Sequence, residues 1–123
     1  MNLFEYGRAL TAIGKNISDI SASNKEVFNL PHNLSININV YRDTVHKLKK
    51  IEAPAIIFSE HLNLIDTFER LITAYSHQLE SVNADGEEIN TELFQKGRDI
   101  VEKETQNLIS ILVKTITLAF NKS

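Results

Sequence analysis

Apolar residues recur along much of the chain at alternating spacings of three and four, which is the period of an amphipathic α-helix. The first such stripe consists of Leu3, Tyr6, Leu10, Ile13, Ile17 and Ile20. Because these positions keep a heptad spacing, the sequence predicts a helix that packs lengthwise against a neighbour. Polar residues fill positions 21–26, and Pro31 and two Asn residues follow them. This change predicts that the first helix ends before Ser21.

Small residues recur every seven positions beside this stripe, at Gly7, Gly14 and Ser21. Each glycine costs about 1 kcal/mol relative to Ala in a helix interior. Two interpretations stay open. The glycines either allow the backbone of another helix to come close, or they are tolerated at the surface. The first interpretation makes Gly7 and Gly14 part of an interaction surface.

The second apolar run fits two kinds of structure. Residues 34–40 alternate between apolar and polar, as in a half-buried strand. No other segment alternates in this way, so such a strand would lack a partner for its backbone groups. The apolar positions also continue at helical spacing as far as Leu48. We therefore predict a second helix with Ser35 as its N-cap, and Pro54 either ends this helix or kinks it into the next.

The third and fourth helices are predicted on either side of a turn. The third carries one long stripe, made of Phe58, Leu62, Ile65, Phe68, Ile72, Tyr75, Leu79 and Val82. Residues 83–86 predict the turn, and the acidic run at 85–88 predicts the start of a fourth helix that extends to about Ala119. The predicted fold class is all-α, an antiparallel bundle of three to four helices. It forms one domain over residues 1–123, with the second helix shorter or kinked at Pro54.

The end of the fourth helix carries more apolar residues than one contact face needs. Nine of the thirteen residues at 108–120 are apolar, and they cover roughly 220° of a helical wheel. The segment is too short to span a bilayer, which takes about twenty residues. This helix is therefore either central in the bundle or in contact with another subunit or partner. The predicted interaction surface comprises Leu108, Ile109, Leu112, Val113, Ile116 and Phe120, together with Gly7 and Gly14.

Composition narrows the classes of function. The 13 basic and 16 acidic side chains give a formal charge of −3, which disfavours nucleic-acid binding through bulk electrostatics. Without cysteine there is no thiolate metal site. The first residues lack the pattern of a signal peptide, so we expect a cytoplasmic protein. We expect no cofactor, because the four glycines are too scattered to form a phosphate-binding loop. The abundance of Ile and Asn suggests an AT-rich bacterial or phage genome.

Histidine and the charge clusters offer further candidates. His61 lies near the centre of the third stripe, which predicts a buried hydrogen bond across the bundle. His46 belongs to a basic patch that either contacts an anion or is a solvated face. The other members of the patch are Arg42, Lys47, Lys49 and Lys50. Seven acidic residues at 85–104 either dock a basic partner or favour the helix start. The spacings Asp43-x-x-His46 and His77-x-x-Glu80 differ from the Glu-x-x-His pairs of di-metal bundles, so no metal site is predicted.

The spacing of Arg70 and His77, Arg-x6-His, resembles the motif of HEPN-type ribonucleases, which are small helical bundles that act as dimers. The resemblance covers eight residues. It implies that Arg70 stabilises phosphate charge and that His77 shuttles a proton during RNA cleavage. Helix geometry puts the two residues about 20° apart on one outward face. In a monomer they are exposed polar side chains, and only a dimer cleft makes them a catalytic site.

The function that we expect from the sequence is protein binding without catalysis. The excess apolar surface on the fourth helix and the absence of a convincing catalytic set favour an adaptor, small regulator, inhibitor or secretion partner. Its partner is another protein or a second copy of the chain. The alternative is a dimeric ribonuclease of the HEPN type that uses Arg70 and His77.

Overall fold

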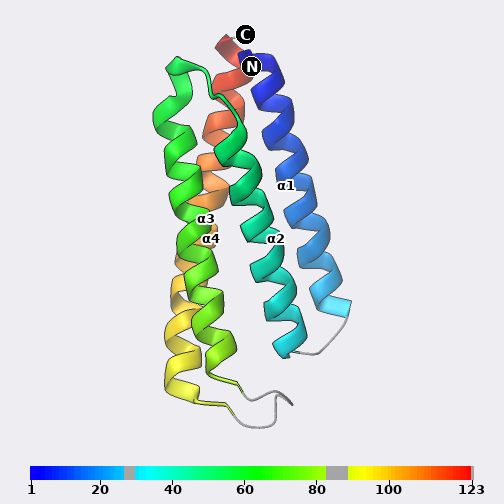
Figure 1. Cartoon of the computed structure of the whole chain (residues 1–123), viewed down its shortest axis with the longest axis vertical. Helices are drawn as coiled ribbons and strands as arrows, with labels where there is room; N and C mark the ends of the chain where they lie inside the picture. Colours follow the sequence, from blue (N-terminus) through cyan, green and yellow to red (C-terminus); the bar gives the residue numbers. More distant parts are fainter. Residues whose placement is uncertain (27–29, 83–88, 123) are drawn as a thin grey trace.

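The computed structural model describes residues 1–26, 30–82 and 89–122, with side chains for 1–19, 31–82 and 89–121. The elements are α1 (Leu3–Glu26), α2 (Leu30–Lys50), the short 3-10 helix η1 (Ala55–Ile57), α3 (Phe58–Glu80) and α4 (Thr91–Lys122). Successive α-helices run in opposite directions, so both termini lie at the same end (Figure 1). The described residues form no strand, only an isolated bridge between Val82 and Ile89. The prediction of an all-α antiparallel bundle is confirmed.

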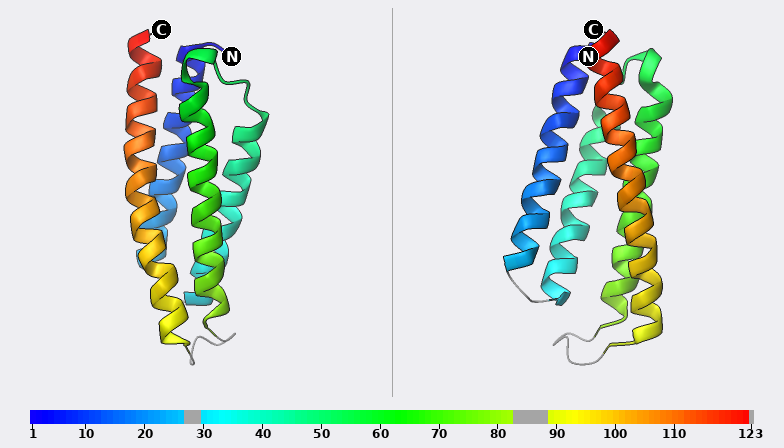
Figure 2. Two further views of the ribbon diagram at one scale, coloured as in Figure 1. Left: turned by 90° about the vertical axis from the view of Figure 1, so that its left-hand side faces the viewer. Right: turned by 180° about the vertical axis from the view of Figure 1, so that it is seen from behind.

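The helices do not contact one another equally. α3 packs extensively against both α2 and α4, whereas α1 packs mainly against α4 and has few contacts with α2. Figure 2 shows α3 beside α4 and α2 from two further sides. A shallow groove of about 460 Å³ therefore runs between α1 and α2. Its lining residues are Ala9, Ala12, Ile13, Asn16, Thr44, Lys47 and Ile51.

The described part of the heptad stripe of α1 faces the core, while the side chain of Ile20 lies outside the described residues. Tyr6 and Leu10 are fully buried, and Leu3, Ile13 and Ile17 pack against the core cluster. The prediction that this helix ends before Ser21 is wrong, because α1 continues to Glu26. Residues 21–26 contain neither proline nor glycine, the two residues that oppose a helix interior most strongly.

The ambiguous second run is helical. The apolar residues that α2 buries are Leu34, Ile38, Tyr41, Val45 and Leu48, at alternating spacings of four and three. The helix already begins at Leu30, so Ser35 is not its N-cap. Pro31 is tolerated in the first turn because its missing N–H would have no partner there. At the other end α2 stops at Lys50, and Pro54 precedes η1, so α2 and α3 are separate helices.

The buried face of α3 is rotated from the predicted stripe. Ile65 and Phe68 are buried as expected, but Phe58 and Leu62 are exposed. The core instead takes Leu64, Leu71 and Ala74. Because α3 lies between α2 and α4, it needs a broader buried arc than a helix that packs on one side only.

The first and last helices of the chain, α1 and α4, both start at an asparagine cap. The side chain of Asn2 accepts a hydrogen bond from the Glu5 amide at 2.8 Å, and that of Asn90 accepts one from the Leu93 amide at 3.2 Å. α4 therefore begins at Thr91, after the predicted start at 85–88, which lies outside the described residues. It also continues beyond the predicted end near Ala119, as far as Lys122.

Glycine allows close helix contact at two positions. A Cβ atom at Gly7 would lie 3.1 Å from the Phe120 ring, so the interpretation of close approach is correct there. At Gly14 a Cβ atom would meet nothing within 4 Å, so this glycine is merely tolerated. Gly97, which the sequence analysis did not single out, is the tightest. Its added Cβ would lie 2.7 Å from Gln78 Cγ and 3.0 Å from the Ala74 carbonyl oxygen.

This contrast predicts opposite effects of one substitution. Gly97→Ala is expected to lower the free energy of unfolding by about 1–2 kcal/mol, because overpacking against the α3 backbone outweighs the gain in helix propensity. Gly14→Ala is expected to raise it by up to about 1 kcal/mol, since only the propensity changes. Urea denaturation of both variants measures the difference. Equal shifts in the same direction would contradict the close packing at Gly97.

Candidate functional site

An apolar row runs along the outer side of α4. Ile109, Val113 and Phe120 are 56%, 61% and 39% exposed, and Ile116 is half-buried. Their spacings of four, three and four place these side chains on one side of the helix. α4 packs against both α3 and α1, yet Ile109 and Val113 stay exposed, so the described helices do not cover the whole apolar arc of α4.

The first turns of α1 extend this row. Phe4 is exposed, and its ring meets the Phe120 ring edge-on, with centroids 5.7 Å apart. Gly7 is buried beneath Phe120, where a larger residue would push the ring away. We call the set Phe4, Ile109, Val113, Ile116 and Phe120 the α1/α4 apolar surface.

Three residues of the predicted interaction surface are buried, namely Gly7, Leu108 and Leu112. Leu108 and Leu112 are buried and belong to the hydrophobic core, together with Ala119. They anchor α4 in the bundle and do not contribute to the α1/α4 apolar surface. The wide apolar arc of the sequence therefore divides into a core side and an exposed side.

A hollow of about 380 Å³ lies on α1 next to Phe120. Its lining residues are Arg8, Thr11, Ala12, Lys15 and Phe120. The Arg8 guanidinium lies 5.9 Å from the centre of the Phe4 ring, within the range of a cation–π contact. The hollow thus joins apolar and basic groups at the edge of the α1/α4 apolar surface.

Arg70 and His77 line another hollow, of about 440 Å³, between α3 and α4. The other lining residues are Asp66, Glu69, Thr73, Ala74 and Ile100. The structure therefore brings both candidate catalytic residues to one concave site within a single chain. Arg70 is half exposed, whereas His77 is more covered.

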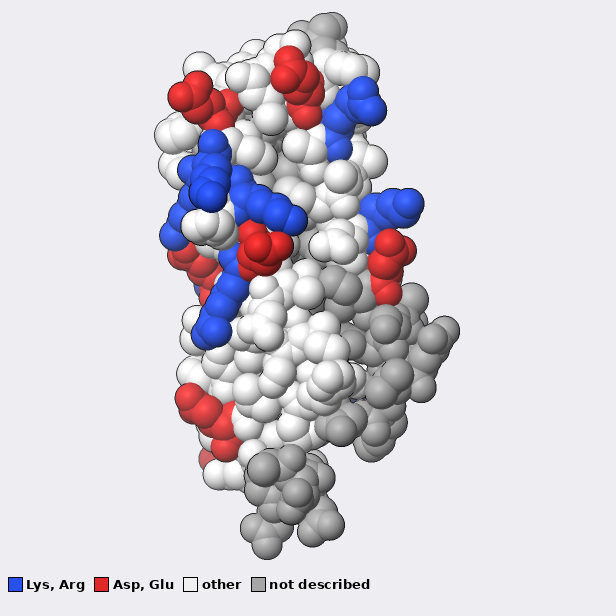
Figure 3. Space-filling view, turned by 45° about the vertical axis from the view of Figure 1, so that its right-hand side comes forward, with Lys and Arg blue, Asp and Glu red and all other residues white. Residues whose placement is uncertain are grey.

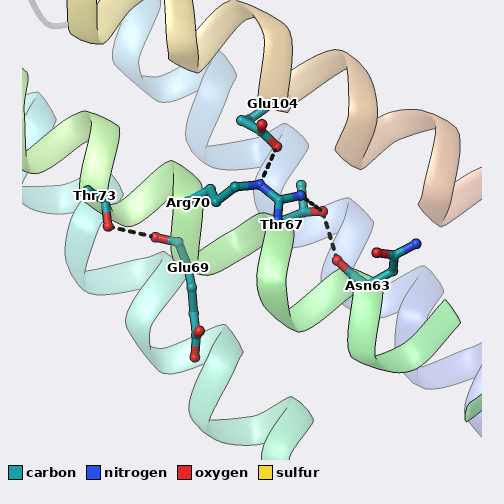
Figure 4. Close-up of polar contacts among 6 residues, drawn as sticks. All are labelled: Asn63, Thr67, Glu69, Arg70, Thr73 and Glu104. Atoms are coloured by element: carbon teal, nitrogen blue, oxygen red, sulfur yellow. Dashed lines mark hydrogen bonds and ion pairs between the residues drawn. The ribbon is translucent and has the colours of Figure 1, made fainter. Parts of the chain in front are cut away.

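The guanidinium of Arg70 already has two partners in the structure. Its Nε donates to Oε2 of the buried Glu104 at 3.0 Å, and its Nη2 donates to Thr67 Oγ1 at 3.1 Å (Figure 4). The Thr67 hydroxyl in turn donates to the Asn63 carbonyl oxygen at 2.7 Å. Sequence reasoning missed Glu104 as a partner, because it is 34 positions away and resembles the other acids of its segment.

His61 makes the predicted hydrogen bond across the bundle. Its Nδ1 lies 2.8 Å from the Tyr6 hydroxyl, so the pair links α3 to α1. Burial lowers the pKa of His61, and a hydrogen bond with the Leu48 backbone opposes this effect. Burial, and more weakly the nearby Glu60 carboxylate, raises the pKa of Tyr6.

The lowered pKa of His61 predicts that acid weakens the fold. Below its ordinary pKa of 6.5, the unfolded chain takes up a proton that the folded chain resists. The free energy of unfolding should therefore fall as the pH drops from 6.5 towards the lower folded-state pKa. Urea titrations of wild type and His61→Gln between pH 7.5 and about pH 5 should show a shallower dependence for the variant. An unchanged pH dependence in His61→Gln would contradict this assignment.

The basic patch lies at the exposed side of α2. Figure 3 shows Lys and Arg side chains gathered on the upper part of this helix. Two of them are paired, because Lys47 lies 3.2 Å from Asp43 and Lys49 lies 2.9 Å from Glu69. The described acids of the segment at 85–104 do not form one uniform exposed patch. Glu104 is buried, and Glu102 lies 3.4 Å from Arg98.

Among the residues that the structure describes, no three His, Cys, Asp or Glu side chains gather where they could hold a metal ion. In the described part of the helices, no segment combines the length and the apolar content needed to cross a bilayer. Comparisons with protein-family models, with curated proteins and with solved structures returned no match for this chain.

Proposed function

We propose that this chain binds another protein through the α1/α4 apolar surface, as an adaptor, small regulator, inhibitor or secretion partner, and catalyses no reaction. The observation that carries this proposal is the exposed row of Ile109, Val113 and Phe120 on α4. Removing apolar surface from water stabilises a complex by roughly 25 cal/mol per Å² before the costs of association. A partner that covers the whole row gains this contribution.

The packing beneath and beside the row supports the proposal. The inner side of α4 is anchored by Leu108, Leu112 and Ala119, and Phe120 packs against Phe4. A surface formed in advance needs little ordering when a partner binds, so more of the gain remains as affinity. Helix faces of this kind bind other helices through apolar residues three and four positions apart.

Photo-crosslinking tests the proposal. A photoreactive amino acid in place of Val113 is expected to capture a protein in the cells that make this chain. The same amino acid in place of Asn39, which is exposed on α2, is the matched control and should capture none. Light scattering of the purified chain then distinguishes a second copy from a different protein. Absence of a captured protein at both Val113 and Ile109, with a monomer at every concentration, would contradict the proposal.

A second candidate function is RNA cleavage of the HEPN type. The observation that favours it is that Arg70 and His77 line one hollow. An RNA phosphate would have to compete with Glu104 for the Arg70 guanidinium. Cleavage of RNA by the wild-type chain should be abolished by His77→Ala and unaffected by His46→Ala. If wild type cleaves no RNA, or if His77→Ala cleaves as well as wild type, this candidate is rejected.

A further inference from the structure

The α1/α4 apolar surface has the dimensions of a helix-binding site. Its row from Ile109 to Phe120 extends over eleven helical steps, or roughly 17 Å, which is about three turns. The hollow on α1 lies beside one end of this row, and its lining includes the small residues Thr11 and Ala12. The open space at Gly14 leaves more room on the same helix. A helix that lies along an apolar row beside a shallow hollow fits it better than a flat partner surface does.

Both charged residues of the hollow are basic. Arg8 and Lys15 are exposed, and they are seven residues apart on α1, so they lie on one side of the helix about 10 Å from each other. Among the described residues, no carboxylate lies within ion-pair distance of either. Other described basic residues do have such partners, as Lys47, Lys49 and Arg98 show.

We infer that the α1/α4 apolar surface binds an amphipathic helix with two acidic side chains, about two turns apart, along one edge of its apolar row. This inference rests on the proposed function and specifies its partner. The acidic side chains would pair with Arg8 and Lys15, while the apolar row covers Ile109, Val113 and Phe120. Such charge pairs at the edge of an interface mainly select the partner and its orientation.

A second copy of this chain fits the surface less well. In a twofold interface the same surface meets itself. The residues of the surface and of its hollow include two cations and no carboxylate. The interface would therefore gather four positive charges, from Arg8 and Lys15 of each copy, with no acid from the surface to pair them.

The test is a selection by the full chain from a display library of amphipathic helical peptides. The apolar row of each peptide is kept as leucine, and the flanking positions are randomised. We expect the enriched peptides to carry Asp or Glu at two flanking positions seven apart. Their Kd should rise about tenfold or more when Arg8→Glu and Lys15→Glu are combined. The matched control, Arg42→Glu with Lys50→Glu, changes the charge equally on α2 and should leave the Kd within about twofold.

The outcomes separate this inference from the proposed function. If the enriched peptides show no acidic preference, or if the charge-reversed chain binds them equally well, the inference is wrong. In that case the proposed function still stands if Val113→Glu removes the binding of the enriched peptides. If Val113→Glu weakens the binding of no selected peptide, the inference and the proposed function are both contradicted. Binding to phosphatidylglycerol vesicles in place of peptides would overturn the inference in favour of a membrane. A doubled solution mass that Val113→Glu abolishes would overturn it in favour of a second copy.

Discussion

Phe68→Ala is expected to lower the free energy of unfolding by about 3–5 kcal/mol, the largest effect of any single substitution considered. Phe68 is fully buried on α3, the helix that packs against both α2 and α4. Its ring meets the Tyr41 ring edge-on, with centroids 5.5 Å apart, and so links α3 to α2. Truncation removes this contact and leaves a cavity that the surrounding helices can fill only in part.

Urea denaturation monitored by circular dichroism measures this loss. Phe58→Ala is the matched control, because Phe58 is the same residue type on the same helix but is 51% exposed. Its cost should be about 0.5 kcal/mol or less. Similar losses for the two variants would contradict the observed rotation of α3, which places Phe68 inside and Phe58 outside.

Arg70→Leu is expected to lower the free energy of unfolding by about 2–3 kcal/mol, because it leaves the Glu104 carboxylate buried without its cation. The Glu104 side chain is 9% exposed, whereas that of Arg70 is 49% exposed. Water that reaches the Arg70 side reduces the cost below that of a fully buried pair. Thr67 Oγ1 also loses the hydrogen bond that it accepts from Arg70.

Two further variants identify the stranded carboxylate as the cause. Arg98→Leu removes an exposed arginine that pairs with the exposed Glu102 on α4, and it should cost about 0.5 kcal/mol or less. The double variant Arg70→Leu/Glu104→Leu should recover most of the lost stability, since no buried charge remains. If Arg70→Leu costs no more than Arg98→Leu, or if the double variant is the least stable, the ion pair of Arg70 and Glu104 does not stabilise the fold in this way.

The same experiments bear on the ribonuclease candidate. If Arg70 chiefly stabilises Glu104, its replacement lowers stability in proportion to the loss of that ion pair. If Arg70 is catalytic, the double variant should lose RNA cleavage although it is still folded. Comparing stability and cleavage in Arg70→Leu/Glu104→Leu therefore distinguishes a structural role for Arg70 from a catalytic one.

Sequence periodicity predicted the candidate surface in part. The excess of apolar residues at 108–120 indicated that one contact face with the core could not cover all of them. Ile109, Val113 and Phe120 are exposed in the structure. The same pattern could not separate them from Leu108 and Leu112, which are just as apolar and are buried. That division depends on how α4 is rotated about its own axis. The packing of α4 against α1 and α3 sets this rotation, and it cannot be inferred from the spacing of apolar residues within α4 alone.

The sequence by itself determined that this chain is helical and which residues could face a core. The heptad of α1 and the spacing from Leu34 to Leu48 are patterns among residues three and four positions apart, so they can be recognised without any tertiary contact. Only the tertiary structure decided the pairs that join distant segments. Tyr6 meets His61 across 55 positions, and Arg70 meets Glu104 across 34. These pairings depend on the relative rotation and axial offset of packed helices, to which every side chain at an interface contributes.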